Sequence, residues 1–446
     1  MVTLPNEIIG DAYTDKTAWK TLTDLVDVGN RMAGQEGERT GAEIIHDKFE
    51  ANGLHAVSMN EFDIPGWWRE DSSLRIKTQN EIEFNKPHEE IALPGSPSGT
   101  VTAPIVDVGT GTPDEFENTD VEGKIAIVSS RTPSDYDRWL HRMEKYVSAY
   151  EHGAEGFVFR NHIEGCLPPT GEIGYHNRPG PIPAIGVSKE VGVQLQRYCN
   201  NTDPEATLSV TSQSKQTTSQ NVEGVVGPDT DDEVLVTAHV DAHDISQGAN
   251  DNGVGSVLVA EIGRLLSQCE SKLETKVRCV TFGAEEIGLF GAYHLADTHN
   301  LNDIKCVINI DGAGTSRNLH IGANEFTDLK HTFEEVTESF EVPLQTSNTI
   351  SPHGDQWAFV QDGVPAVMAS TTSEKSGRGW GHTHADTLDK IDRRDLRDIA
   401  VILTESVLTI SEKEREFTHK SREEIQELID EGYKQELKKG GRWPYS

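Results

Sequence analysis

The sequence predicts an α/β sandwich together with a smaller β-rich domain, and two patterns support this fold class. From residue 233 onward, short strand-like runs of aliphatic residues alternate with helical segments, which is the rhythm of a sheet covered by helices. Between residues 100 and 212, short apolar runs recur with one helix among them. A chain of 446 residues is long enough for two or three domains.

The first half of the chain is expected to contain helices, then strands, then two boundaries. Residues 16–56 should be helical, and the stretch to about residue 85 should mix short strands with polar loops. Pro, Gly and Ser cluster at 86–100, and residues 213–222 are polar and loop-like, so both are predicted boundaries. Between them we expect a helix at 138–152 and strands at APIVDV, GKIAIVSS, GAEGFVF and IPAIGVS.

The second half should form the main sheet and end in a charged tail. The expected helices are 253–268 and 394–412, and the expected strands are EVLVTAHV, KVRCVTF, KCVINI and VPAVMAS. In the tail, Ser421 and Glu424 have the spacing of a capping box. One amphipathic helix is predicted there, ending at Gly440-Gly441 and either docked or dimerising, with a frayed solvated tail as the alternative. Its apolar face would carry Ile425, Leu428, Ile429 and Tyr433.

The composition excludes some classes of partner. There are 74 Asp and Glu against 40 Lys and Arg, a formal net charge of -34. Such a surface repels phosphate backbones and anionic membranes, so we expect no nucleic-acid or membrane partner. Concentrated salt screens this self-repulsion, because the Debye length falls to about 3 Å at 1 M. A halophilic protein is one reading of the charge, and an ordinary acidic soluble enzyme is the other.

The chain also lacks the usual signals for export. No apolar stretch approaches the roughly 18–20 residues that span a bilayer, and the first residues show neither a basic region nor a long apolar one. There are five cysteines, an odd number, and they are widely spaced with no CxxC pair. This favours free thiols in a reducing compartment, and we predict a cytoplasmic protein.

Acidic and imidazole side chains follow the ends of the predicted strands. His239 ends EVLVTAHV, and Asp241 lies two residues further on, so both lean the same way. Open α/β sheets bind ligands beyond the carboxyl ends of their strands. Two imidazoles with several carboxylates suit Zn²⁺ or a similar ion, and a shared carboxylate would let the set hold two ions. The other groups at these ends are Asp251, Glu285, Glu286, Asp311 and His382.

Together these segments resemble the co-catalytic di-zinc exopeptidase family, which includes bacterial leucine aminopeptidases, plasma glutamate carboxypeptidase and glutamate carboxypeptidase II. The resemblance covers roughly residues 221–412, and residues 100–212 look like the protease-associated domain often inserted in that family. It implies a three-layer α/β/α sandwich with a mixed central sheet. The segments that carry it are HVD, GANDNG, GAEEIG, NIDGAG and GHTHADTLDKID.

The resemblance also implies a division of the chain. Residues 1–90 would be the amino-terminal part of the peptidase domain, and residues 91–218 the protease-associated domain. Residues 219–412 would be the main part of the peptidase domain, followed by a charged helical tail at 413–446.

A role for each site residue is implied in the same way. His239 and Asp311 would bind one zinc, Glu286 and His382 the other, and Asp251 both. Co²⁺ or Mn²⁺ are alternative ions. A hydroxide bridging the ions would attack the peptide, with Glu285 as the general base. Asp241 would steady the ring of His239, and the peptide bond after Asp251 is expected to be cis.

The sequence departs from the family in its specificity region. In SPHGDQWAF, Asp355 matches the family's Asp-His pair, but Gln356 replaces the His, and His353 is a possible substitute. His243 and His384 are extra imidazoles, which we interpret as pocket or supporting groups. The site prediction therefore leaves substrate preference open.

The leading hypothesis is a zinc aminopeptidase acting on peptides, with a homo-oligomer possible. A carboxypeptidase or dipeptidase of the same family is the alternative, and it would need a cationic clamp such as Arg317 or Arg378. Two further readings are a non-catalytic binding module and a single-zinc, glutaminyl-cyclase-like acyltransferase. The number of metal ions bound per chain would distinguish both from a two-zinc peptidase.

Overall fold

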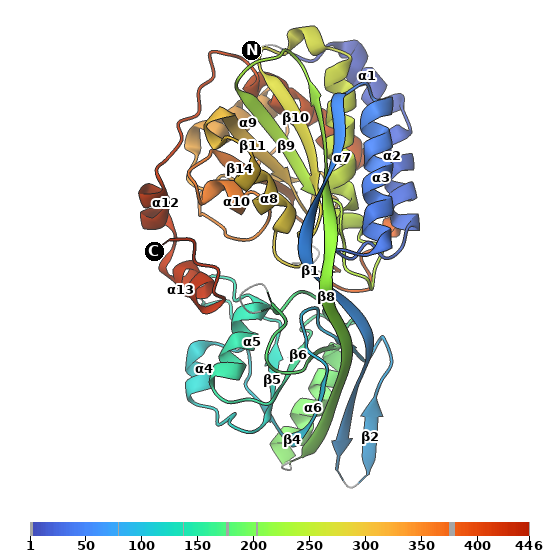
Figure 1. The fold of residues 1–446 in the computed structure, drawn as a ribbon, viewed down its shortest axis with the longest axis vertical. Helices are drawn as coiled ribbons and strands as arrows, with labels where there is room; N and C mark the ends of the chain where they lie inside the picture. Colours follow the sequence, from blue (N-terminus) through green and yellow to red (C-terminus); the bar gives the residue numbers. More distant parts are fainter. Residues whose placement is uncertain are drawn as a thin grey trace.

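The structure is a computed structural model that describes residues 3–78, 80–136, 138–174, 178–201, 204–373 and 380–445. It has two lobes joined by a pair of long strands (Figure 1). In the larger lobe the middle of the sheet is parallel, because β9 pairs in parallel with β10 and β11, and β11 with β14. The flanking strands β8 and β12 are antiparallel to β10 and β14. Their bounds are β8 Glu205–Val226, β9 Glu233–His239, β10 Lys276–Phe282, β11 Ile304–Ile310, β12 Leu319–Gly322, β13 Gln345–Ser347 and β14 Ala366–Thr371.

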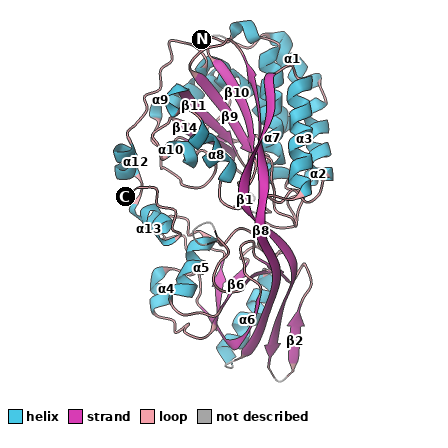
Figure 2. Ribbon diagram, viewed as in Figure 1, coloured by secondary structure: helices cyan, strands magenta, loops and turns pink. Residues whose placement is uncertain are grey.

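Helices cover both faces of this sheet, so its central strands are buried. Every residue of β9 is buried, which explains its almost continuous apolar sequence. Figure 2 shows α2, α3 and α7 on one side, with α8, α9 and α10 on the other. The bounds are α1 Asn6–Thr14, α2 Thr17–Asp27, α3 Glu36–Ala51, α7 Val254–Ser267, α8 Phe290–Thr298, α9 Thr327–Ser339, α10 Trp357–Val360 and α11 Arg393–Ile410.

Two long antiparallel strands connect the lobes. Strand β1 (His55–Lys77) pairs with β8 from His55 opposite Val225 to Lys77 opposite Glu205. One end of β8 therefore belongs to the large sheet beside β10, and the other pairs with β4 of the smaller lobe. The strands β1 and β8 thus run from the large sheet into the smaller lobe without a break (Figure 1).

Within the described residues, the smaller lobe contains its own largely parallel strands and three helices. Strands β4, β5, β6 and β7 pair in parallel, except that β4 meets β8 antiparallel and β3 meets β7 antiparallel. The bounds are β2 Glu81–Phe84, β3 Glu90–Ala92, β4 Gly99–Asp107, β5 Ile125–Ser129, β6 Gly156–Arg160, β7 Ala184–Val187, α4 Pro113–Glu117, α5 Arg142–Glu151 and α6 Lys189–Asn201.

The C-terminal tail spans from the large lobe to the small one (Figure 1). It forms two short helices, α12 (Arg422–Leu428) and α13 (Glu431–Lys439). In α13, Glu436 lies 3.2 Å from Arg138 of the small lobe and 3.3 Å from His353 of the large lobe. The tail therefore contacts both lobes.

The predicted fold class is confirmed, while three local expectations are wrong. Residues 213–222 are not a loop, because they lie inside β8. The segment before residue 85 contains β2 and, in place of short strands and polar loops, the long strand β1, which pairs with β8. Pairing between β1 and β8 overrides their polar composition. The tail is not one helix, since Asp430 accepts the backbone N–H of Gly432 and starts α13 anew. The capping box at Ser421 and Glu424 is present, and Ile425 and Ile429 are buried whereas Leu428 is exposed.

No helix among the described residues is long and apolar enough to cross a membrane.

Candidate metal centre

The site lies where the parallel strands end. His239 is the last residue of β9, Asp311 directly follows β11, and Glu285 lies three residues beyond β10. Because β9 is parallel to both β10 and β11, these three ends meet at one edge of the sheet. Asp251 reaches the same place from a single irregular turn, Ala249–Gly253, before α7. The peptide bond between Asp251 and Asn252 is cis, as expected.

Asp251 lies between two groups of side chains. Its Oδ1 lies 3.4 Å from Nε2 of His239, and its Oδ2 lies 3.2 Å from Nε2 of His382. On the first side, His239 Nε2 is also 3.7 Å from Asp311 Oδ1. On the second side, His382 Nε2 is 3.5 Å from Glu286 Oε2. The structure thus brings all five predicted ligands together around one shared carboxylate.

These spacings are suitable for metal ions. Zinc bonds of about 2.0–2.2 Å in tetrahedral geometry place neighbouring ligand atoms about 3.4 Å apart. The donor atoms of His239, Asp251 and Asp311 all lie within 4.8 Å of one another, as do those of His243, Glu286 and His382. Nε2 of His239 is buried and makes no hydrogen bond among the described residues. A coordinating cation would satisfy it.

The electrostatics also favour cations. Burial, with Asp251 and Glu285 nearby, raises the pKa of Glu286 well above its ordinary value. Burial raises the pKa of Glu285 to about 7, and the charges of Asp311 and Asp241 act in the same direction. Carboxylates packed this closely oppose one another's ionisation, and a divalent cation removes that opposition.

Asp241 fastens the loop after β10 to the loop after β9. Its two carboxylate oxygens accept the backbone N–H groups of Glu285 and Glu286, each at 3.1 Å. Nδ1 of His239 lies 3.1 Å from the Asp241 carbonyl oxygen and 3.4 Å from its carboxylate. Asp241 therefore positions His239 together with both glutamates.

The chain's relatives fit this geometry. Residues 221–407 match the profile of peptidase family M28, and residues 101–195 match that of the PA domain. Its peptidase domain, at residues 221–407, belongs to peptidase family M28. The chain is similar to aminopeptidase YwaD of Bacillus subtilis (strain 168), with 28% identity over 90% of this chain and 86% of the relative. It is also similar to human carboxypeptidase Q, with 25% identity over 86% of this chain and 83% of the relative.

A solved structure gives the same result. The zinc aminopeptidase BSAP from Bacillus subtilis superposes with a TM-score of 0.68 at 26% identity, covering 88% of this chain and 94% of that one. The smaller lobe of this M28 peptidase, at residues 101–195, is thus its PA domain, and the recognition of the family from its sequence is confirmed.

Sequence reasoning missed three buried charged residues that support the M28 site. Asp386, four residues after His382, accepts the backbone N–H groups of Asn250 and Asp251, both at 2.9 Å. Glu38 accepts the N–H of Ala284 at 2.9 Å, just before Glu285. Asp386 lies inside the segment GHTHADTLDKID and could have been found there, whereas Glu38 has no signal in the sequence.

The third missed residue is Arg31, which is fully buried. Its guanidinium donates to the carbonyl oxygens of Val240, Leu25, Gln247 and Gly248 at 2.8–3.0 Å. These bonds fix the loop that leads from β9 to Asp251. A lone arginine far upstream gives no sequence signal for this role.

A cavity of about 250 Å³ opens over the cluster. Its floor includes Asp251, Glu285 and Asp311 from the M28 domain. The walls come from the M28 domain, the smaller lobe and the tail. The smaller lobe contributes Trp139, His141, Arg142 and Glu172, and the tail contributes Arg442.

The residues that depart from the family lie in distinct places. Gln356 is buried, and its amide bridges Asn309 and the carbonyl oxygen of His353. His353 lines the cavity and stacks on His141 at 5.0 Å. Asp355 is buried and neither of its carboxylate oxygens has a hydrogen bond among the described residues; burial and Glu285 raise its pKa well above the ordinary value.

The clamp and pocket residues suggested from the sequence lie elsewhere. Arg317 has a side chain 64% exposed beside Asp398 and is not among the described residues that line the cavity. Arg378 lies outside the described residues. His384 is exposed and, within the described chain, does not line the cavity either. Among the described residues, the arginines that do line it are Arg142 and Arg442.

Proposed function

We propose that this M28 peptidase is a zinc aminopeptidase whose site binds two ions through the shared carboxylate of Asp251. The observation that carries the proposal is the position of Asp251, with one oxygen toward His239 and the other toward His382. Support also comes from relatives named aminopeptidase and zinc aminopeptidase. Zinc is preferred because the donors are imidazoles and carboxylates.

The ligands divide into two sets around Asp251. His239 and Asp311 would hold one ion, and Glu286 and His382 would hold the other. When bound, the ions supply Lewis acidity that activates water at neutral pH and stabilises developing negative charge on the scissile carbonyl. The three carboxylates Asp251, Glu286 and Asp311 offset most of the charge of two dications.

Glu285 would act as the general base. It lines the cavity beside the ligand Glu286, and its backbone is held by Asp241. Its carboxylate would accept a proton from the attacking water and deliver it to the departing amine. A group in this role typically contributes about 10²–10⁴ in rate.

Cavity-lining carboxylates would bind the free α-amine of the substrate, with Glu285 and Glu172 as candidates.

The alternative function is a dipeptidase or carboxypeptidase, and the arginines of the same cavity are the observation in its favour. Arg442 lines this cavity, and its guanidinium donates through Nη2 to Glu172 at 2.8 Å. Such a donor is suited to the carboxylate of a short peptide.

A substrate panel with one variant tests the proposal. The panel contains an aminoacyl p-nitroanilide, a free dipeptide, an N-acetylated dipeptide and an N-blocked longer peptide. An aminopeptidase cleaves the first two and spares both blocked peptides, whereas a carboxypeptidase cleaves the last. In Glu285→Gln we expect unchanged zinc content with kcat lowered about 10²–10⁴-fold. Full activity in this variant would contradict the proposed base.

Metal content separates the remaining readings. Two zinc ions per chain are expected. One ion would favour the acyltransferase reading, and none would favour a binding module.

A further inference from the structure

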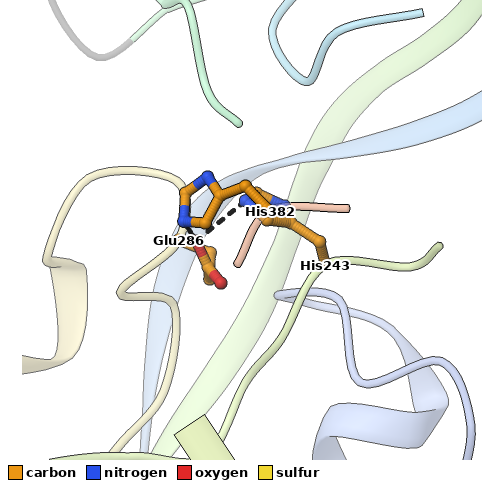
Figure 3. A group of neighbouring side chains, drawn as sticks. All are labelled: His243, Glu286 and His382. Carbon is orange, nitrogen blue, oxygen red and sulfur yellow. Dashed lines mark ion pairs between the residues drawn. The ribbon is translucent and has the colours of Figure 1, made fainter. Parts of the chain in front are cut away.

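His243 is a buried imidazole beside the ligand set whose role the proposed function leaves unexplained. It lies in the loop that follows β9, and only 2% of its surface is exposed. Figure 3 shows it with Glu286 and His382, three side chains that converge from separate loops. Nε2 of His243 is 2.9 Å from Oε2 of Glu286, and the ring meets that of His382 edge-on at 4.5 Å.

Hydrogen bonding does not account for the position of this side chain. Neither ring nitrogen of His243 makes a hydrogen bond within the described part of the chain, in spite of the short distance to Glu286. Leaving a buried polar group without a partner costs about 1–3 kcal/mol. Among the described residues His243 does not line the cavity, so it is not placed to touch substrate.

The loop around His243 is fixed on both sides. The N–H of Ala242 donates to the carbonyl oxygen of Arg31 at 3.1 Å. On the other side, the carboxylate of Asp244 receives two hydrogen bonds from Arg69, at 2.9 and 2.7 Å. The imidazole is therefore held against Glu286 by a rigid segment, as a metal ligand requires.

The three donor atoms have the spacing of ligands to one ion. Those of His243, Glu286 and His382 lie within 4.8 Å of one another. The two distances to Glu286 Oε2, 2.9 Å from His243 and 3.5 Å from His382, lie on either side of the roughly 3.4 Å expected for tetrahedral zinc. Two imidazoles and a carboxylate form a common protein zinc set.

We propose that His243 is an additional ligand of the ion held by Glu286 and His382, so that the centre uses three imidazoles in all. The inference rests on the proposed two-ion function and extends its ligand set. It makes the two positions unequal, because the His239 side has one imidazole and the His382 side has two. The ion at Glu286 and His382 is then the one that depends on His243.

Zinc titration of the full chain tests the assignment. The protein is stripped with a chelator and titrated with zinc in competition with a chromophoric chelator, which gives a dissociation constant for each ion. In His243→Gln we expect one ion weakened at least about 100-fold and the other within threefold of wild type. The matched control, His384→Gln, removes an exposed imidazole two residues from His382 and should leave both constants unchanged.

The outcomes distinguish this inference from the proposed function. If wild type binds two ions and His243→Gln binds both within threefold of wild type, His243 is not a ligand while the two-ion site stands. If wild type binds no zinc, both proposals fail. A crystal structure of zinc-loaded wild type decides the matter should the variant not fold: Nε2 of His243 is expected about 2.0–2.1 Å from an ion, and a separation above about 3 Å overturns the inference.

Discussion

The carboxylate of Asp386 accepts the backbone N–H of Asp251 at 2.9 Å, so a buried acid holds the backbone of the residue that lies between His239 and His382. A second bond, from the N–H of Asn250 to the other oxygen, has the same length. The irregular turn before α7 thus depends on a side chain that is more than a hundred residues away in sequence.

Replacing this acid should weaken metal binding without removing a ligand. In Asp386→Asn, the amide NH₂ faces one of the two N–H groups, and one hydrogen bond is lost. We expect zinc affinity to fall about 10–100-fold, measured by chelator competition. The control Asp389→Asn alters an exposed carboxylate paired with Lys390 and should have no effect. Unchanged affinity in Asp386→Asn would mean that Asp251 is held without it.

The tail should influence substrate choice through Arg442. If its guanidinium binds the carboxylate of a short peptide, Arg442→Gln removes a charged hydrogen bond of about 1.5–3 kcal/mol. We expect kcat/KM for a free dipeptide to fall at least about tenfold. An aminoacyl p-nitroanilide, which has no carboxylate, should be cleaved nearly as before.

Lys439→Gln is the control for that measurement. Lys439 lies in the same tail and donates to Ser148, but within the described chain it does not line the cavity. An equal loss for both substrates in Arg442→Gln would show that the arginine acts on structure and not on the substrate carboxylate.

Glu90 should make the folded state sensitive to pH. Burial raises its pKa to about 7, and its Oε2 accepts the hydroxyl of Ser72 at 2.7 Å. Between the ordinary value of 4.5 and about 7, the unfolded carboxyl ionises while the folded one keeps its proton. The folded state therefore binds more protons, and stability falls as pH rises through this window and is level above it.

Replacing Glu90 by Gln should remove this pH-dependent loss of folding stability, which is about 3 kcal/mol at pH 8. Urea unfolding at pH 5 and pH 8 measures it, and we expect Glu90→Gln to be the more stable protein only at pH 8. Glu205→Gln, an exposed carboxylate on β8, is the control. A variant with the same pH dependence as wild type would contradict the raised pKa.

The acidic surface should make stability depend on salt. A formal net charge of -34 repels itself in the folded state, and screening relieves this repulsion. If the protein is halophilic, its melting temperature rises between 0.1 and 2 M KCl, measured by calorimetry. A flat response would favour an ordinary acidic enzyme.

The sequence predicted the parts of the fold that have regular periodicity. Strands such as β9 and β11 are apolar runs because both faces of the sheet are covered. His239 at the end of β9 and Asp311 directly after β11 mark the edge where the candidate site lies. Chain order alone was enough to place the five expected ligands at the ends of these strands or in the loops beside them.

What the sequence could not show depends on pairing across long distances. The polar segment 213–222 forms a strand because β1 lies beside it, and no local pattern reveals that partner. Likewise, Glu38 and Arg31 come from helical and loop segments far upstream, and only the folded chain brings them beneath the site. The metal role proposed for His243 depends on its approach to Glu286, which sequence spacing does not encode.

The most direct test of a two-ion site around Asp251 is an anomalous-difference map of zinc-loaded crystals, recorded at the zinc absorption edge. Two peaks about 3.5–4 Å apart, one near each oxygen of Asp251, are the predicted result. A single peak, or two peaks that do not share Asp251, would contradict the account.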